Sequence, residues 1–270
     1  GAAADWRAFR ASLVAEEEAE ARAGAGAESR RSPANGAILR SQDPGLAAEP
    51  TWAHPTTLAE EGGVLLRAAP RGGNPAAEGQ EQGLWQAVVL LLRAGPGGSI
   101  GVVINRPTGL RVGDPRLRSQ TAAGDAADVK EVDLGDLAHT FSGSPLYFGG
   151  FRAQAMVHIV HGREDVAGSS EVSSGVFAGG LQGALDLVQA GEAAPADFRF
   201  FLGCMAWGPG ELEDELKQGL WHTAAVSRNL VLKQCVALPT PLWKEMMELM
   251  GGEFLEIARK NYPHSPAPGE

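Results

Sequence analysis

The sequence contains few of the residues that usually form disulfides or zinc sites. Of its 270 residues only two are cysteine, Cys204 and Cys235, and neither has a neighbour at metal-ligand spacing. Both stand among apolar residues, which favours buried free thiols over a disulfide. His158 and His161 lie in a strand-like segment, where their odd spacing puts them on opposite faces. The sequence therefore predicts no metal site and no cofactor.

Long apolar runs and basic clusters are also missing. The longest apolar run, Ala87 to Leu92, is far shorter than the roughly 18 residues that a membrane-spanning helix needs. The net charge is −10, and the nearest approach to a basic cluster is Arg30-Arg31. Proteins that bind nucleic acid usually present a basic face. We therefore expect a soluble protein that neither spans a membrane nor binds nucleic acid directly.

The sequence also lacks a recognisable set of catalytic residues. No G-x-S-x-G elbow occurs in the chain. Cys204 is the best candidate nucleophile, because it ends a predicted strand just before a turn and a helix N-terminus, where the pKa of a thiol can fall. His222 is near it in sequence, but the apolar neighbours Phe201 and Met205 favour an inert core thiol. The sequence favours a protein without catalytic activity and leaves an enzyme as the alternative.

What the sequence does contain is organised around Phe198 to Ser227. The apolar run at its start predicts a strand covered on both faces, with a bulge at Gly203. A glycine-rich turn at 207–210 leads into an acidic helix, whose buried stripe is Leu212 and Leu216. A second strand is predicted to begin at Trp221. This order predicts an α/β domain.

The rest of the chain supplies further predicted elements. A hairpin is predicted for 84–93 and 99–105, because two apolar strands are separated by a short glycine-proline loop. Segments 43–55 and 108–144 are expected to be largely irregular, and Thr240 is expected to cap the last helical region. Further strands are predicted at 37–40, 63–68, 146–149, 155–160 and 175–178, and a helix at 181–189.

The sequence also predicts three parts of unequal size. Residues 1–35 read as a helix and a flexible linker, 36–262 as the α/β domain, and 263–270 as a tail. In the N-terminal helix, Trp6 and Phe9 belong to an apolar stripe that ends half-way along. Such a helix docks by its first turns, either on its own domain or on a partner.

Two places carry candidate binding residues. Asn105 and Arg106 end a buried strand with polar groups, and Arg106 either binds an anionic ligand or pairs with a carboxylate that fixes the loop. Glu211, Asp214 and Glu215 share one face of the acidic helix, where carboxylates can hold a cation or can simply match the helix dipole on a solvated surface.

Several separate motifs resemble one known family. Gly101 to Thr108, GVVINRPT, resembles the GLVINRPT signature of the AlgH-like (YqgE) family. Leu146 to Gly150 and Phe198 to Gly203 are similar to further motifs of that family, as are the downstream Trp207, Pro209-Gly210, Leu212, Glu215 and Trp221. The resemblance covers about 36–260. One departure is Phe151-Arg152, which follows Gly150 where Pro-Val is common.

The resemblance implies one α/β domain built on a mixed, partly barrel-like sheet flanked by short helices, and it implies no established activity. Asp5-Trp6-Arg7 and Phe9-Arg10 resemble the plastid members of plants and green algae, which implies the chloroplast stroma, with a bacterial-type cytoplasm as the alternative.

Together these features predict an interaction, assembly or regulatory protein. We expect it to bind a protein partner or a larger complex through Trp6, Phe9, Glu211, Asp214 and Glu215. The alternative is an enzyme or sensor that binds a small anion beside Asn105, Arg106 and the turn at Trp207.

Overall fold

The structure is a computed structural model that describes residues 32–69, 83–114 and 134–263. Trp6 and Phe9, and the helix predicted to carry them, lie outside these residues. The strands are β1 Ala53–Thr56, β2 Val64–Arg67, β3 Val88–Arg93, β4 Ser99–Val103, β5 Pro107–Arg111, β6 Pro145–Phe148, β7 Arg152–His161, β8 Ser169–Ser173, β9 Val176–Gly179, β10 Phe198–Trp207 and β11 Trp221–Val226. The helices are α2 Pro33–Gln42, α3 Pro44–Ala47, α5 Leu134–Thr140, α6 Leu181–Gln189, α7 Glu211–Lys217, α8 Arg228–Leu232, α9 Leu242–Met250 and α10 Gly252–Asn261, with a short 3₁₀ turn η3 at Pro195–Asp197.

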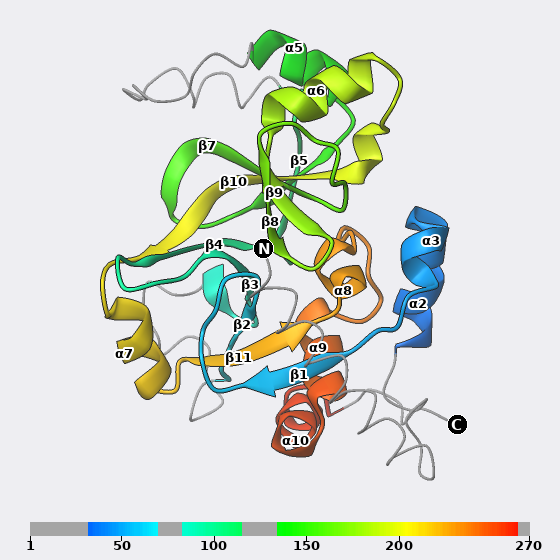
Figure 1. Ribbon diagram of the computed structural model, residues 1–270. Helices are drawn as coiled ribbons and strands as arrows, with labels where there is room; N and C mark the ends of the chain where they lie inside the picture. Colours follow the sequence, from blue (N-terminus) through cyan, green and yellow to red (C-terminus); the bar gives the residue numbers. More distant parts are fainter. Residues whose placement is uncertain (1–31, 70–82, 115–133, 264–270) are drawn as a thin grey trace.

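The strands form one large, mixed and open sheet (Figure 1). Its main path runs β1-β11-β2-β3-β4-β10-β7-β9-β8, and β5 and β6 branch from β10. The pairing is antiparallel except between β6 and β10, which run parallel. The expected mixed sheet flanked by short helices is confirmed, although the sheet does not close into a barrel. The predicted hairpin is confirmed as β3 and β4.

Strand β10 joins the two halves of this sheet. Its first half pairs with β6 and β7, and its last three residues pair with β4. The register shifts between Leu202 and Cys204, so the bulge predicted at Gly203 is confirmed. Gly203 has a φ of +73°, and a Cβ there would lie 2.6 Å from the carbonyl oxygen of Gly150. Only glycine accepts this combination without strain.

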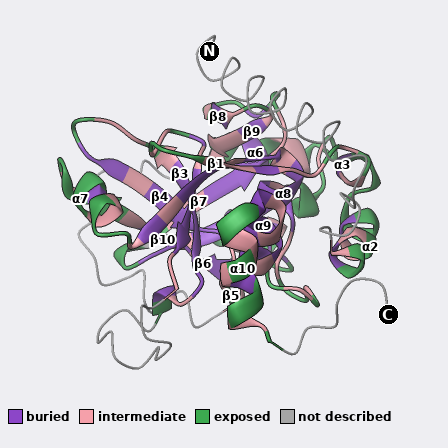
Figure 2. Cartoon of the chain, turned by 90° about the horizontal axis from the view of Figure 1, so that it is seen from below, coloured by how far each residue is buried: buried purple, intermediate pink, exposed green. Residues whose placement is uncertain are grey.

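Helices pack on the sheet at separate places (Figure 1). Helices α5 and α6 lie together at one end, where Phe141 packs against Phe198 and Phe200 of β10. Helices α9 and α10 lie at the other end and bury Trp243 and Met246 against the main core. Figure 2 shows that the central strands are buried along most of their length, whereas α7 and α10 present exposed faces. Every helix among the described residues is too short or too polar to cross a bilayer.

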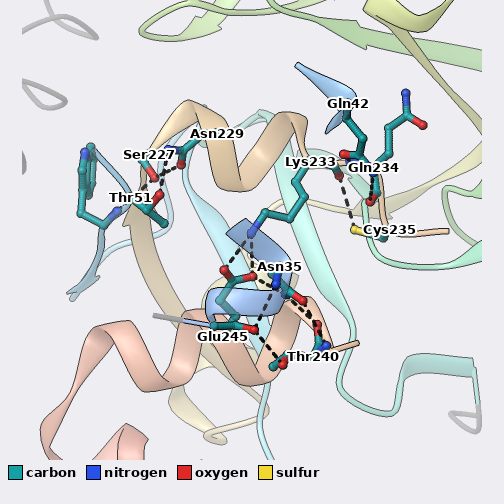
Figure 3. Close-up of polar contacts among 12 residues, drawn as sticks. Asn35, Gln42, Thr51, Ser227, Asn229, Lys233, Gln234, Cys235, Thr240 and Glu245 are labelled. Atoms are coloured by element: carbon teal, nitrogen blue, oxygen red, sulfur yellow. Dashed lines mark hydrogen bonds and ion pairs between the residues drawn. The ribbon is translucent and has the colours of Figure 1, made fainter. Parts of the chain in front are cut away.

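The strand predicted at 37–40 is wrong, because these residues belong to helix α2. Ser32 caps this helix by accepting a hydrogen bond from the Asn35 backbone N–H. The buried Asn35 amide donates to Thr240 O and Glu245 Oε2, and its oxygen accepts from the Thr240 N–H (Figure 3). These partners are more than 200 positions away, so local sequence patterns do not reveal them.

The predicted cap at Thr240 is also wrong. Helix α9 begins at Leu242 after Pro241, and no side chain caps it. Thr240 instead accepts a hydrogen bond from the Ser32 hydroxyl. The segments expected to be irregular contain three elements that the sequence does not reveal, namely α3, β1 and β5.

Candidate functional site

The Asn105 side chain holds the end of the β3–β4 hairpin together. Its Oδ1 accepts a hydrogen bond from the Val88 N–H at 2.9 Å, and its Nδ2 donates to Gln86 O at 2.9 Å. Gln86 has a φ of +52°, which is rare for a residue with a side chain. Both polar ends of Asn105 are therefore used to hold this turn, and Asn105 is a positioning residue for the neighbouring Arg106.

Arg106 is half-buried and has no carboxylate partner among the described residues. Among the described residues, its Nη1 donates to the Asn105 carbonyl, at 3.3 Å. Burial lowers the pKa of the guanidinium, and the nearby Tyr262 hydroxyl opposes that shift. Tyr262 donates in turn to Gln86 Oε1, and Lys244 Nζ lies 5.4 Å from the centre of its ring. The structure thus groups Arg106 with Tyr262 and Lys244, which the sequence does not place together.

Trp207 does not share this site. It pairs with Ser99 at the start of β4, whereas Arg106 follows the other end of the same strand. The length of strand β4, about 13 Å at roughly 3.3 Å per residue, therefore lies between Trp207 and Arg106. The Trp207 indole donates to Glu215 Oε2 at 3.0 Å, and the Trp221 indole donates to the same atom at 2.5 Å. Trp207 is therefore held in a structural contact between β10, α7 and β11.

The three candidate binding residues of α7, Glu211, Asp214 and Glu215, have three different partners. Glu211 accepts a hydrogen bond from the Gly208 N–H at 2.7 Å and thereby closes its own turn. Glu215 holds the two indoles, and Asp214 pairs with Lys217 at 2.9 Å on the exposed surface. Within the described ranges no cluster of His, Cys, Asp and Glu has the arrangement of a metal site. Glu211 and Asp214 are both exposed, and of these two Asp214 pairs with a side chain on the surface rather than with the backbone of the turn.

The two thiols are free, and neither is activated. Burial raises the pKa of both Cys204 and Cys235, so both are protonated near neutral pH. His222 on β11 is separated from Cys204 on β10 by the three strands β2, β3 and β4. This base is therefore out of hydrogen-bond reach of the candidate nucleophile.

The predicted strand around His158 and His161 is confirmed as β7. His161 is fully buried, and its Nε2 lies 3.3 Å from Gly179 O. Burial lowers the pKa of both rings. Phe201 pairs with His158 and Phe198 with His161 along the same ladder, so both histidines are part of the strand packing.

Among the described residues, the first half of β7 presents an exposed sheet edge that sequence reasoning missed. Along one edge β7 pairs with β10, but along the other its pairing with described strands is limited to β9 at Val160 and His161. Phe151, just before the strand, is 44 % exposed, and Met156 within it is 41 % exposed. The sequence signal for this surface is Phe151-Arg152 itself, because an aromatic residue there departs from the family pattern.

The fold and its motifs define an α/β protein of the AlgH-like class. The AlgH-like (DUF179) family model matches residues 75–255. A UPF0301 protein of Chlorobium limicola is 30 % identical over 188 residues, which cover 69 % of this chain and 87 % of that protein. A UPF0301 protein of Streptomyces coelicolor is 32 % identical over 212 residues, covering 76 % and 93 %. The chain belongs to the AlgH-like family.

A solved structure shows the same fold. Protein DIP2367 of Corynebacterium diphtheriae has a TM-score of 0.53 at 16 % identity and covers 75 % of this chain and 93 % of its own. The AlgH protein of Pseudomonas aeruginosa, also UPF0301, has a TM-score of 0.46 at 19 % identity and covers 66 % and 85 %. The names of these relatives state no activity.

Proposed function

We propose that this AlgH-like chain is a non-enzymatic binding protein that acts through contacts with another protein. The observation that carries the proposal is the exposed edge of β7 between Arg152 and Ile159, with Phe151 and Met156 beside it. A free strand edge accepts an extended segment from a partner by main-chain hydrogen bonds, and exposed apolar side chains add affinity.

The state of the candidate catalytic groups supports binding over catalysis. The Cys204 thiol is buried and protonated, and His222 lies three strands away. Glu211 and Glu215 already hold the backbone turn and the two indoles. In the proposal, Asp214 and the N-terminal residues Trp6 and Phe9 add a second, acidic and apolar contact to the same partner.

The experiment is affinity purification of the tagged protein from its own cells under mild conditions. Met156→Lys places a charge on the β7 edge, and Leu58→Lys places the same charge on another apolar residue, which is 66 % exposed. We expect a stoichiometric partner that Met156→Lys loses and Leu58→Lys keeps. Recovery of no stoichiometric partner, or equal recovery with both variants, contradicts the proposal.

A chloroplast location is part of the proposal and rests on the resemblance of Asp5 to Arg10 to the plastid members of the family. The relatives compared above are bacterial, so a bacterial-type cytoplasm is the alternative. Immunolocalisation with an antibody against the purified protein separates the two locations. Signal outside the plastid contradicts the chloroplast proposal.

A second candidate function is the sensing of a small anion beside Arg106. It is favoured by one observation, the half-buried guanidinium without a carboxylate partner among the described residues. The test is a thermal-shift screen of small anionic metabolites with Arg106→Gln and, as a control, Arg259→Gln, whose arginine is exposed. If no anion raises the melting temperature, or if Arg106→Gln leaves the effect intact, this function is excluded.

A further inference from the structure

A separate cavity of about 180 Å³ lies between the helix pair α2–α3 and the ends of β7, β10 and α8. Figure 1 shows α2 and α3 beside α8, on the side of the sheet away from α7. Leu39, Leu46 and Leu232 form an apolar part of its wall. The polar part consists of Gln42, Asp43, Arg163, Asp197, Arg199 and Arg228, together with Gln234. Neither the β7 edge nor Arg106 belongs to this cavity.

Arg199 is the most deeply buried charge of the wall, with 3 % of its surface exposed. Its Nη1 donates to Val231 O and its Nη2 to Ile104 O, at 2.7 Å for the second. Its guanidinium carbon lies 4.7 Å from the ring centre of Tyr147. The Nε atom is buried and has no hydrogen-bond partner. Within the described ranges no carboxylate pairs with Arg199, so its charge is not neutralised by an ion pair.

This arrangement is unusual because a buried charge is normally paired. The two carbonyl oxygens and the aromatic ring supply partial compensation, since they offer negative partial charge without a full negative charge. An anion in the adjoining cavity would supply the missing charge.

Two further arginines share the same wall and still reach solvent. The Arg163 side chain is 28 % exposed and pairs with Asp165 and Asp197. The Arg228 side chain is 34 % exposed, and its Nε lies 3.3 Å from Glu49 Oε2 without the geometry of a hydrogen bond. Ion pairs as exposed as these are weak, so either guanidinium can turn to a ligand at small cost.

The backbone leaves room for the Arg228 side chain. A Cβ added at Gly175 would lie 2.5 Å from Arg228 Nη1, and Gly175 has a φ of +66°. The glycine thus leaves the space through which the guanidinium passes along the β8–β9 turn. Gln42 closes the other side, because its side chain bonds reciprocally to the backbone N–H and carbonyl of Gln234 (Figure 3).

The two carboxylates in the wall, Asp43 and Asp197, already have partners within the protein. Asp43 Oδ1 accepts from the Leu46 N–H and caps α3, and Asp197 Oδ2 accepts from the Ala194 N–H and lies 3.4 Å from Arg163. Arg163 and Arg228 also pair with Asp165 and Glu49, which lie just outside the wall. Arg199 is therefore the one arginine of the wall without an ion pair among the described residues.

We propose that this cavity binds a small organic oxyanion, a carboxylate or phosphate group on a short apolar body. Arg199 and Arg228 hold the oxyanion, since guanidinium groups pair with such groups through two parallel hydrogen bonds. The apolar body packs against Leu39, Leu46 and Leu232. The volume of about 180 Å³ admits a molecule of a few carbon atoms and excludes a nucleotide.

The test is a calorimetric titration of the full chain with inorganic phosphate, with butyrate and with butyl phosphate, each at constant ionic strength set by chloride. We expect saturable binding with one site per chain, and we expect butyl phosphate or butyrate to bind more tightly than inorganic phosphate because of the apolar wall. Inorganic phosphate as the tightest ligand keeps the oxyanion site and overturns the apolar subsite. No saturable binding of any of the three overturns the proposal.

Three variants assign the binding to this cavity. Arg228→Gln is expected to weaken affinity about tenfold or more, because it removes a charge-assisted hydrogen bond. Arg259→Gln, which changes an exposed arginine on α10, is expected to leave affinity unchanged, as is Arg106→Gln. Arg199→Gln is expected to abolish binding, and if it does not fold, Arg228→Gln decides alone. Unchanged affinity in Arg228→Gln overturns the proposal, whereas loss in Arg106→Gln alone assigns the anion to the other site.

Discussion

Two buried cations in this molecule, Lys233 and Arg199, differ in whether a carboxylate neutralises their charge. Lys233 is 1 % exposed, and its Nζ lies 2.7 Å from both oxygens of Glu245, which is 3 % exposed. Asn35 donates to Glu245 as well (Figure 3). Arg199 is almost as deeply buried, yet its contacts among the described residues are carbonyl oxygens, aromatic rings, the Tyr147 hydroxyl and the Cys235 thiol, and none of these is a carboxylate.

The comparison distinguishes a buried charge that stabilises the fold from a buried charge that can bind a ligand. Lys233 and Glu245 neutralise each other inside the protein, and with Asn35 they join α2, α9 and the end of α8. This pair therefore has no uncompensated charge that would attract a ligand. At Arg199 the compensation is partial and the neighbouring space is hollow. A buried charge indicates a binding site only when its partners are counted.

The largest effect is expected for breaking the fully paired site. Lys233→Met leaves the Glu245 carboxylate buried without its cation, which costs about 3–5 kcal/mol of unfolding free energy. Urea denaturation followed by circular dichroism measures it. The double variant Lys233→Met with Glu245→Leu should recover part of the loss, because it removes both charges. A single variant that loses less than about 1 kcal/mol contradicts the structural role.

The next effect concerns Glu215, a carboxylate whose partners are neutral indoles. Glu215→Ala leaves the Trp207 and Trp221 N–H groups without an acceptor and should cost about 2–3 kcal/mol. Tryptophan emission should shift to the red as water reaches the rings. Glu213→Ala, an exposed neighbour on the same helix, is the control and should change neither stability nor emission.

Arg199→Met should cost less than Lys233→Met, about 1–2 kcal/mol in buffer without added anion. Two hydrogen bonds to carbonyls are lost, but a buried charge without an ion pair is removed as well. The measurement is the same urea denaturation. A loss equal to that of Lys233→Met would make Arg199 a structural residue and would remove the contrast between the two sites.

Acid should destabilise the protein through a buried group that is kept neutral. Burial lowers the pKa of His161, whereas the unfolded ring takes up a proton near pH 6.5. The stability that it contributes is present above about pH 6.5 and is lost as the pH falls toward the folded pKa. The unfolding free energy measured between about pH 5 and pH 8 should therefore fall on acidification, and His161→Phe should flatten the slope. A slope that is the same in both proteins contradicts this role; His158 and His222 shift in the same direction and account for the remainder.

The smallest effect is expected on the surface of α7. Asp214 and Lys217 pair at 2.9 Å, but their side chains are 66 % and 75 % exposed. Water and salt screen such a pair, so Asp214→Ala should leave the urea midpoint unchanged. A measurable loss would show that exposed pairs matter here as much as the buried ones.

The central elements could be predicted because their signals are local. Strands β3, β4 and β10 are apolar runs, the bulge is marked by Gly203, and helix α6 follows the predicted residues 181–189. Helix α2 could not be predicted, because Asn35 gains its buried partners only from the far end of the chain. Strand β1 contains Pro55, and its position beside β11 at the end of the sheet is also set by a distant segment.

The candidate site was predicted only in part, because some of its features are local in the sequence and others depend on contacts between distant segments. The position of Arg106 after a buried strand is visible in the sequence, but its separation from Trp207 depends on which strands pair. Arg199 appears in the sequence as one polar residue within a strand. The sequence does not reveal that Arg199 lacks a carboxylate partner among the described residues or that Arg163 and Arg228 share its cavity. Both depend on contacts between β7, β10, α8 and the helix pair α2–α3.

The contacts of helix α2 also decide when the protein becomes complete during its synthesis. Asn35 and Glu245 are 210 positions apart, and Ser32 and Thr240 are 208 apart. A nascent chain therefore carries α2 without a docking place until Thr240 and Glu245 have left the ribosome, since contacts between distant residues form late. One wall of the arginine-lined cavity is the α2–α3 pair, so a shortened chain that ends before α9 should carry the sheet without the cavity.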